Sequence, residues 1–288
     1  MDTPTVVSLL PATTEISTQL GVIPEAVSHT CDYPPAVKGQ PVITEFDGEQ
    51  YSLRESLLQD INPDVILTQS LCGECAIDSL AVEKKIEEMN LDSSIVSTHT
   101  TGTEDLFDNI QNIGVAVNRR SEAQSYVDKL RTRLDSLKTR TQSLAERPTV
   151  LVLDWIEPTM IARGWVPELV EIGGGIYDDM SQPPEIEEKD EWNLLRSVDP
   201  DIIIVAPCNY SIDESCKQLY TLQTMPEWSE LTAVRNNEIY FMDGNHYVNR
   251  PGPRLIETAR YFAGLIHPDR FNAPPSEVVR SISTVIQS

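Results

Sequence analysis

The sequence is short of lysine and of long apolar runs, and each shortage excludes a class of partner. Only seven of its 22 basic residues are Lys, and 45 acidic residues bring the formal net charge to −23. So acidic a chain repels nucleic acid and anionic membranes. Because the acidic residues are spread along the whole chain, we predict a halophilic surface whose self-repulsion is screened by salt. No apolar run approaches the roughly 18–20 residues of a membrane span.

Cysteine is also scarce, and the opening of the sequence does not resemble a leader. The five cysteines are an odd number in a chain of 288 residues, which is long enough to bury a core without covalent bridges. We therefore expect no disulfide framework. The opening residues, MDTPTVVSLLPATTE, lack a basic region followed by an apolar one. We expect either a cytosolic protein or a chain from which a leader was removed.

The sequence lacks the common signatures of enzymes, namely G-x-S-x-G, G-x-x-x-x-G-K-[ST] and H-E-x-x-H. The glycine-rich run EIGGGIYDD, at 171–179, follows a helix-like stretch and predicts a helix C-cap and turn. We therefore predict a protein that is not an enzyme and that requires no cofactor.

What the sequence does contain is an internal repeat. LLQDINPDVILTQ (57–69) matches LLRSVDPDIIIVA (194–206), and TVVSLLPATTE (5–15) matches TVLVLDWIEPT (149–159). A third pair, SIVSTHTTGTEDL (94–106) and EIYFMDGNHYVNR (238–250), follows in the same order. Three ordered pairs at nearly one offset predict two similar lobes.

Each lobe alternates apolar, β-branched runs with helical patterns, which is typical of parallel sheets covered on both faces. We predict strands near residues 5–10, 26–29, 65–69 and 94–98 in the first lobe, and near 149–154, 160–163, 202–206 and 238–242 in the second. The predicted fold class is α/β, with two similar lobes of mainly parallel sheets and a ligand cleft between them.

Residues 119–148 carry apolar side chains at helical spacing, among them Leu130, Leu134 and Leu137. They predict one long, rigid helix of about 25 residues and about 38 Å. The predicted domains are an N-terminal lobe at 1–118, this connecting helix at 119–148, and a C-terminal lobe at 149–288.

Ligands of open parallel sheets bind beyond the carboxyl ends of the strands, and the unusual residues of this chain fall there. The candidates are His29, Cys31, Cys72, Cys75 and His99 in the first lobe, and Trp155, Trp165, Cys208, Tyr210, His246 and Tyr247 in the second. Cys216 and His267 are more simply a buried small side chain and a helix cap.

Cys72 and Cys75 stand in C-x-x-C spacing, which leaves several chemistries open. A complete zinc site needs a second close pair, and a redox dithiol needs a helix start after a strand. The wall of a ligand pocket is the third reading, and a purely structural role is the fourth. The candidates for a soft metal ion are His29, Cys31, Cys72, Cys75 and His99.

Several segments, in order over nearly the whole chain, resemble the vitamin B12-binding type of ABC-importer substrate-binding protein, in the siderophore and B12 group of periplasmic-binding-protein-like folds. They are VVSLLPATTEI, SHTCDYPP, NPDVILTQ, the long mid-chain helix and DGNHYVNRPGPR. The resemblance implies two α/β lobes, little hinge motion, and a corrinoid bound between the lobes for delivery to an ABC importer. We also expect a monomer.

Carried over residue by residue, the resemblance implies ligand contacts in both lobes. They are Pro11, Ala12, Thr13, Thr14, Thr30, Tyr33, Glu45, Phe46 and Gln69 in the first, and Asp154, Trp155, Arg163, His246 and Tyr247 in the second. To these we add His29, Cys72, Trp165, Cys208 and Tyr210 from the strand ends. Thr13 is also a candidate N-cap of the first helix. Aromatic walls with scattered hydrogen-bonding groups suit a corrinoid, which has an apolar ring and amide arms.

In the family, a Glu seven residues before the Pro of each NPD or DPD repeat docks onto arginines of the importer. Ser56 and Asn193 hold those positions here, so the resemblance makes the nearby Glu55 and Glu191 the predicted docking residues.

Two other functions stay open. The same fold could bind haem or a ferric siderophore. Alternatively, the chain could be a cytosolic metal- or redox-handling protein that uses the cluster of His29, Cys31, Cys72 and Cys75.

Overall fold

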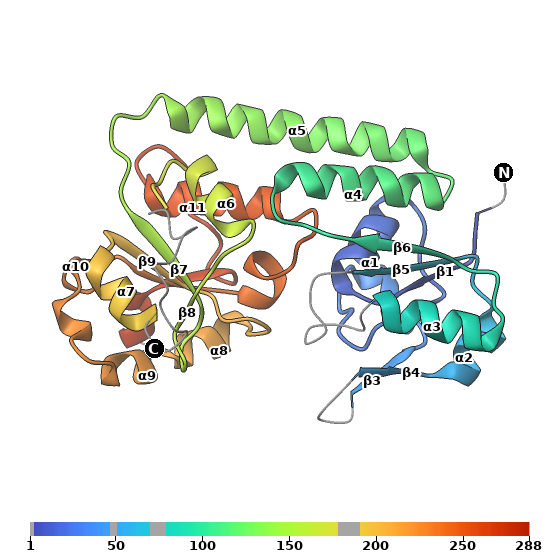
Figure 1. Cartoon of the computed structure of the whole chain (residues 1–288). Helices are drawn as coiled ribbons and strands as arrows, with labels where there is room; N and C mark the ends of the chain where they lie inside the picture. Colours follow the sequence, from blue (N-terminus) through green and yellow to red (C-terminus); the bar gives the residue numbers. More distant parts are fainter. Residues whose placement is uncertain (1–2, 47–50, 70–78, 178–190, 288) are drawn as a thin grey trace. The chain divides into compact units, whose positions relative to one another are not determined.

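The chain folds as two compact units, Met1–Arg131 and Thr132–Ser288. The computed structural model describes residues 3–46, 51–69, 79–177 and 191–287 (Figure 1). The predicted lobes 1–118 and 149–288 each lie within one unit. Each unit holds a mainly parallel sheet covered by helices, so the predicted α/β class with two sheet-containing lobes is confirmed.

The sheet of unit 1 has the strand order β2-β1-β5-β6, and all its neighbours pair in parallel. Its strands are β1 (Val6–Ser8), β2 (Ala26–Val27), β5 (Val65–Gln69) and β6 (Ser94–Thr98). Every residue of β5 is buried, as expected of a central parallel strand with few polar side chains. These strands fall where the sequence predicted them.

Helices cover both faces of this sheet (Figure 1). They are α1 (Pro11–Gln19) and α4 (Thr103–Ala116) on one face, and α2 (Glu55–Ile61) and α3 (Ser79–Met89) on the other. Leu58 of α2 and Val82 and Ile86 of α3 pack with Val7 and Ile66 of the sheet. A short antiparallel pair, β3 (Thr44–Phe46) and β4 (Tyr51–Leu53), was not predicted.

The sheet of unit 2 has the order β11-β10-β9-β7-β8. Its strands are β7 (Val150–Trp155), β8 (Met160–Ile161), β9 (Ile202–Val205), β10 (Ile239–Met242) and β11 (Val279–Ser281). The three inner strands are parallel, and β8 and β11 are antiparallel edges. The inner strands are almost wholly buried, which explains their runs of Val, Ile and Leu.

The helices of unit 2 include a tightly packed pair, α6 (Val166–Ile172) and α11 (Leu255–Ile266) (Figure 1). The others are α7 (Glu191–Val198), α8 (Ile212–Lys217), α9 (Leu219–Thr224), α10 (Thr232–Arg235) and α12 (Ile282–Gln287). Gly173 caps α6, Gly174 has a φ of +92°, and His267 caps α11. Both predicted helix ends are therefore confirmed.

The long helix α5 runs from Arg120 to Gln142, so the predicted helix of about 25 residues is present. Its first half packs on α4 in unit 1, where the Arg131 guanidinium pairs with Glu104 and lies 4.6 Å from the centre of the Phe107 ring. Its last turn belongs to unit 2, where the Thr141 hydroxyl donates to Ile172 O at 2.9 Å. Within the described ranges, no helix is long and apolar enough to cross a membrane.

Replacing Gly114 by Ala tests the contact between α4 and α5. A Cβ at this position would lie 2.3 Å from Ala123 Cβ, so the two helices must move apart. Alanine gains about 1 kcal/mol of helix propensity, but overpacking of this severity outweighs that gain. We expect the free energy of unfolding in urea to fall by about 1–3 kcal/mol.

The matched control is Val115→Ala, which truncates an exposed neighbour on the same helix and should change stability by no more than about 0.5 kcal/mol. A Gly114→Ala protein as stable as the parent would show that the helices can separate at no cost.

Candidate functional site

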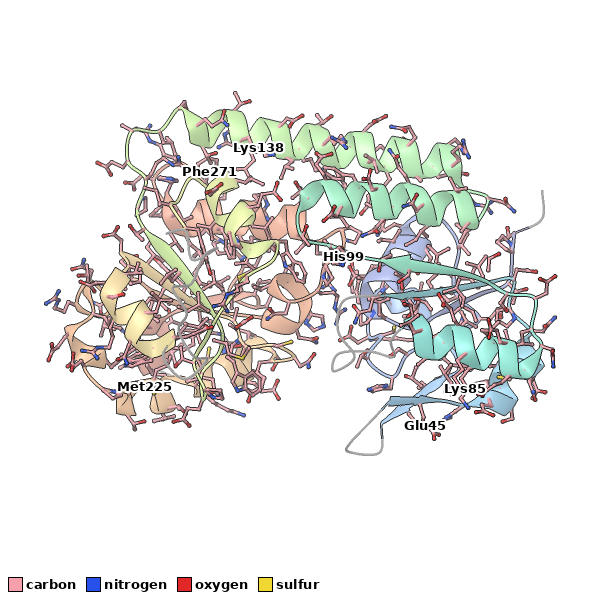
Figure 2. All side chains as sticks on the ribbon, viewed as in Figure 1. Glu45, Lys85, His99, Lys138, Met225 and Phe271 are labelled. Carbon is pink, nitrogen blue, oxygen red and sulfur yellow. The ribbon has the colours of Figure 1, made fainter. Side chains whose placement is uncertain are left out.

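The candidate residues of unit 1 follow the carboxyl ends of its parallel strands. Pro11–Thr14 form the first turn of α1 after β1, and His29 and Thr30 follow β2. Gln69 ends β5, and His99 follows β6, where Figure 2 labels it. Because the four strands are parallel, all of these residues lie at the same end of the sheet, where the strands have their carboxyl ends.

The threonines of α1 hold the turn after β1 together. Thr13 and Thr14 are fully buried, and each hydroxyl lies 2.8 Å from Ser8 Oγ and 3.1 Å from Leu10 O. Thr14 Oγ1 is also 3.1 Å from Cys31 Sγ. Leu10 occupies the N-cap of α1, so the capping role predicted for Thr13 is wrong. Ala12 is buried too, and the predicted ligand contacts of this turn stay a prediction.

Thr44, which the sequence analysis missed, contacts both the backbone and the ring of His29. The Thr44 hydroxyl donates to Ser28 Oγ at 3.2 Å, accepts from the His29 backbone N–H at 2.9 Å and lies 2.8 Å from His29 Nδ1. The Thr44 hydroxyl therefore links His29 to Ser28. Desolvation lowers the pKa of His29, which favours the neutral ring.

The remaining candidates of unit 1 differ in exposure. Tyr33 is exposed, and Gln69 is buried. Glu45, labelled in Figure 2, is exposed and accepts from Arg54 Nε at 2.6 Å. Phe46 ends β3, but its side chain lies outside the described part of the structure.

The predicted metal set stays a prediction. Cys72 and Cys75 lie outside the described residues, as does their loop. His29 and His99 follow β2 and β6, which are opposite edge strands of the sheet and stand about 14 Å apart at the usual strand spacing. The described ranges contain no group of three His, Cys, Asp or Glu side chains placed to hold a metal ion.

In unit 2 hydrogen bonds join the loops that follow β7, β9 and β10 at the carboxyl ends of these strands. The Cys208 N–H donates to Asp154 O at 2.9 Å, and the Asn245 N–H donates to Tyr210 O at 3.0 Å. Gly244 makes the second contact possible, because a Cβ there would lie 2.2 Å from Pro207 O. These bonds bring the three predicted candidate segments of unit 2 together.

Trp155 and Tyr210 form an aromatic wall at these strand ends. Their rings meet edge to face, with centroids 5.5 Å apart. They border an open pocket of about 170 Å³, whose other lining residues are Ile156, Glu157, Pro207, Gln218 and Thr221. The pocket therefore combines apolar ring surface with amide and hydroxyl groups and one carboxylate.

The loop after β10 presents His246 and Tyr247 from a short π-helix, Gly244–Val248. Such irregular turns recur at functional sites. His246 Nδ1 lies 2.7 Å from Asp243 Oδ2, and the Tyr247 ring packs edge to face on Tyr261 with centroids 5.4 Å apart. The D-x-x-H spacing could have revealed the role of Asp243, which the sequence analysis missed.

Trp165 supports the same loop rather than standing alone. Its indole Nε1 donates to Val248 O at 2.8 Å, and its side chain is partly buried. Thr258 of α11 donates to Tyr247 O at 2.7 Å. The loop after β10 is thus held from two helices, which orients the side chains of His246 and Tyr247.

A group of ionisable side chains lies beside β7, and we call Asp154, Glu191, Arg163 and Tyr177 the Asp154 cluster. Arg163 Nη2 donates to Glu191 Oε1 at 2.7 Å, and the Ile161 N–H donates to Glu191 Oε2 at 2.5 Å. The Tyr177 hydroxyl donates to Ala162 O at 2.5 Å. These bonds engage both oxygens of Glu191.

Asp154 is the unsatisfied member of the Asp154 cluster. Its Oδ1 atom is buried and has no hydrogen-bond partner in the part of the chain that the structure describes. Burial and the nearby Glu191 carboxylate raise the pKa of Asp154 from 3.8 to about 6. Arg163 offsets part of this effect, but its closest partner is Glu191.

The two predicted docking residues differ. Glu191 is 8% exposed and both its carboxylate oxygens are engaged inside unit 2, so the docking role predicted for it is wrong. Glu55 is exposed at the start of α2 and pairs at 2.6 Å with Lys85 of α3, which Figure 2 labels. Burial of Glu191 could not be read from its place in the sequence.

Asp154→Asn should stabilise the protein at neutral pH and hardly at all in acid. An Asp whose pKa is raised in the folded state stabilises the fold while it is protonated, which holds below about pH 4. This stabilisation is lost as the pH rises through about 6 and the carboxylate becomes charged. The shift from 3.8 to about 6 corresponds to about 3 kcal/mol at pH 7.5. We expect urea unfolding to show a gain of up to that size at pH 7.5 and under about 1 kcal/mol at pH 4.

Asp269→Asn removes an exposed carboxylate from the same unit and is the matched control, with a change of no more than about 0.5 kcal/mol at either pH. A gain for Asp154→Asn that is equal at both pH values would mean that the substitution acts through packing and not through charge.

Comparison with known proteins adds to this geometry. Residues 6–245 match the family model described as periplasmic binding protein. The chain is 24% identical over 273 residues to the uncharacterized ABC transporter substrate-binding lipoprotein YvrC of Bacillus subtilis (strain 168), covering 92% of this chain and 81% of that protein.

Two solved structures show the same fold. The periplasmic vitamin B12 binding protein BtuF of Vibrio cholerae has a TM-score of 0.67 and 20% identity, over 91% of this chain and 95% of that one. The periplasmic heme-binding protein RhuT from Roseiflexus sp. RS-1 has a TM-score of 0.72 and 18% identity, over 93% and 99%. With most of its length matched by the family model, the chain belongs to the periplasmic binding protein family.

Proposed function

We propose that this protein is the substrate-binding component of an ABC importer and that its ligand is a corrinoid. It acts by binding and delivery and performs no catalysis. The observation that carries the proposal is the edge of the unit 2 sheet, where Trp155 and Tyr210 offer ring surface beside the polar side chains of Gln218 and Thr221. An apolar macrocycle with amide arms needs this mixture.

The edge of unit 1 supports the same ligand with a different chemistry. Tyr33 is an exposed ring, and the neighbouring His29 is exposed with its Nδ1 bonded to Thr44. We propose that these residues contact the ligand, together with the turn at Pro11–Thr14. Cys72 and Cys75 are proposed as part of the pocket wall, with a soft metal ion as the alternative.

Haem and ferric siderophores are the alternative ligands. The fold similarity to a heme-binding protein favours haem as much as the similarity to BtuF favours a corrinoid. The family and the similarity to a lipoprotein favour a place outside the cytoplasmic membrane, which we propose for this protein. We also propose that it works as a monomer and that its acidic surface is adapted to high salt.

Titration with cyanocobalamin tests the ligand. We expect saturable one-to-one binding by calorimetry, and Trp155→Ala should weaken it by about tenfold or more, because a buried aromatic contact is lost. Trp155→Phe should recover part of the affinity. Tyr220→Ala, which truncates an exposed ring on α9, is the control and should bind like the parent.

Haem and a ferric siderophore are titrated in parallel. Binding of either with no response to cyanocobalamin would replace the corrinoid by that ligand. An absence of binding to all three probes would contradict the proposed ligand class.

Docking on the importer is tested separately at Glu55. We expect Glu55→Gln to weaken association with the permease several-fold at low salt, because a charge at the rim of an interface steers association. Ligand-stimulated ATP hydrolysis by the permease in nanodiscs measures this. Glu87→Gln, an exposed position on α3, is the control, and equal effects of the two substitutions would argue against a specific role of Glu55.

A further inference from the structure

The Asp154 cluster carries one more negative charge than its own residues can balance. It holds two carboxylates, Asp154 and Glu191, against the single guanidinium of Arg163. Arg163 Nη2 and the Ile161 N–H are both directed at Glu191. The charge of Glu191 is therefore balanced, and the charge of Asp154 is left over.

Asp154 also lacks the donors that a buried carboxylate normally has. Most buried carboxylates accept several hydrogen bonds, and an unsatisfied one is costly. Among the described residues, nothing donates to the buried Oδ1 atom, and Tyr177 gives its proton to Ala162 O instead. The Asp154 carboxylate thus has its own backbone N–H as a donor, but within the described ranges its Oδ1 atom has none.

The place of Asp154 in the chain puts it next to the candidate pocket of unit 2. Asp154 is the next-to-last residue of β7, at the carboxyl end where the sheet edge begins. Trp155, its neighbour in the chain, lines the pocket that carries the proposed function, and the backbone O of Asp154 holds the loop of Cys208. The strand pairing is irregular between Leu153 and Trp155, so Asp154 stands out of the ordinary register.

We propose that Asp154 is a specificity-determining residue, which accepts a hydrogen bond from an N–H donor on the ligand and rejects ligands that present a carboxylate there. The proposal rests on the proposed function and deepens it. An amide arm supplies N–H donors to the carboxylate of Asp154, a residue that is partly exposed. A carboxylate arm supplies none and adds like charge beside Asp154 and Glu191, and such repulsion is an effective way to exclude a competitor.

A pair of ligands that differ in one group tests the proposal. The probes are cyanocobalamin and its monocarboxylate derivatives, in each of which one amide arm is hydrolysed to an acid. We expect the parent protein at pH 7.5 to bind at least one monocarboxylate isomer about tenfold or more weakly than cyanocobalamin. Asp154→Asn should reduce that ratio to less than about threefold, because Asn keeps the shape without the charge.

The pH dependence of this discrimination is a second test, because a merely structural role of Asp154 would not change it. Among the described residues, the titratable groups that face Asp154 are Glu191 from α7, Arg163 after β8 and Tyr177 after α6, and protonation of Asp154 cancels the excess charge among them. At pH 5 the parent protein should discriminate as weakly as Asp154→Asn does at pH 7.5. Asp269→Asn, with its exposed carboxylate removed, should discriminate like the parent at both pH values.

The outcomes separate this inference from the function on which it rests. If the parent protein binds cyanocobalamin but treats every monocarboxylate isomer alike, or if Asp154→Asn keeps the full discrimination, the role of Asp154 is overturned and the corrinoid stands. If the parent protein does not bind cyanocobalamin at all, the proposed ligand is overturned and this inference with it.

Discussion

Parallel strand pairing is the constraint on which the candidate site depends. Strands that run the same way end at the same edge, so the loops that follow them must gather there. In unit 2 the loops after β7, β9 and β10 are further tied by backbone hydrogen bonds from Cys208 to Asp154 and from Asn245 to Tyr210. Side chains from distant parts of the sequence thus become neighbours through main-chain geometry alone.

This constraint explains why so much could be predicted from the sequence. The β-branched runs of β5 and β9 are buried on both faces, so their pattern is unambiguous, and the residues just after them are placed once the strands are known. The repeat in the sequence corresponds to α2 and β5 in one unit and to α7 and β9 in the other. Local signals also placed helix ends correctly, as at Gly173 and His267.

What the sequence could not show are contacts between segments with no shared pattern. Thr44 bonds to His29 across 15 positions, and it does so from a hairpin too short to leave a periodic signal. Gly244 is required because the backbone of another loop passes 2.2 Å from where its Cβ would be, which only the folded chain reveals. Glu191 looked like a surface acid, yet Arg163 and a backbone N–H draw it inside.

The Asp154 cluster shows how a departure from the usual rules of burial can mark function. A strand end that only had to fold would gain stability from an apolar or amide residue at this position, because the buried charge there has a raised pKa and an unsatisfied oxygen within the described structure. Glu191 in the same cluster is fully bonded, so the fold is able to satisfy a buried carboxylate where stability alone matters. The role proposed for Asp154 rests on the contrast between these two acids: both oxygens of Glu191 are bonded, whereas no described residue bonds Oδ1 of Asp154.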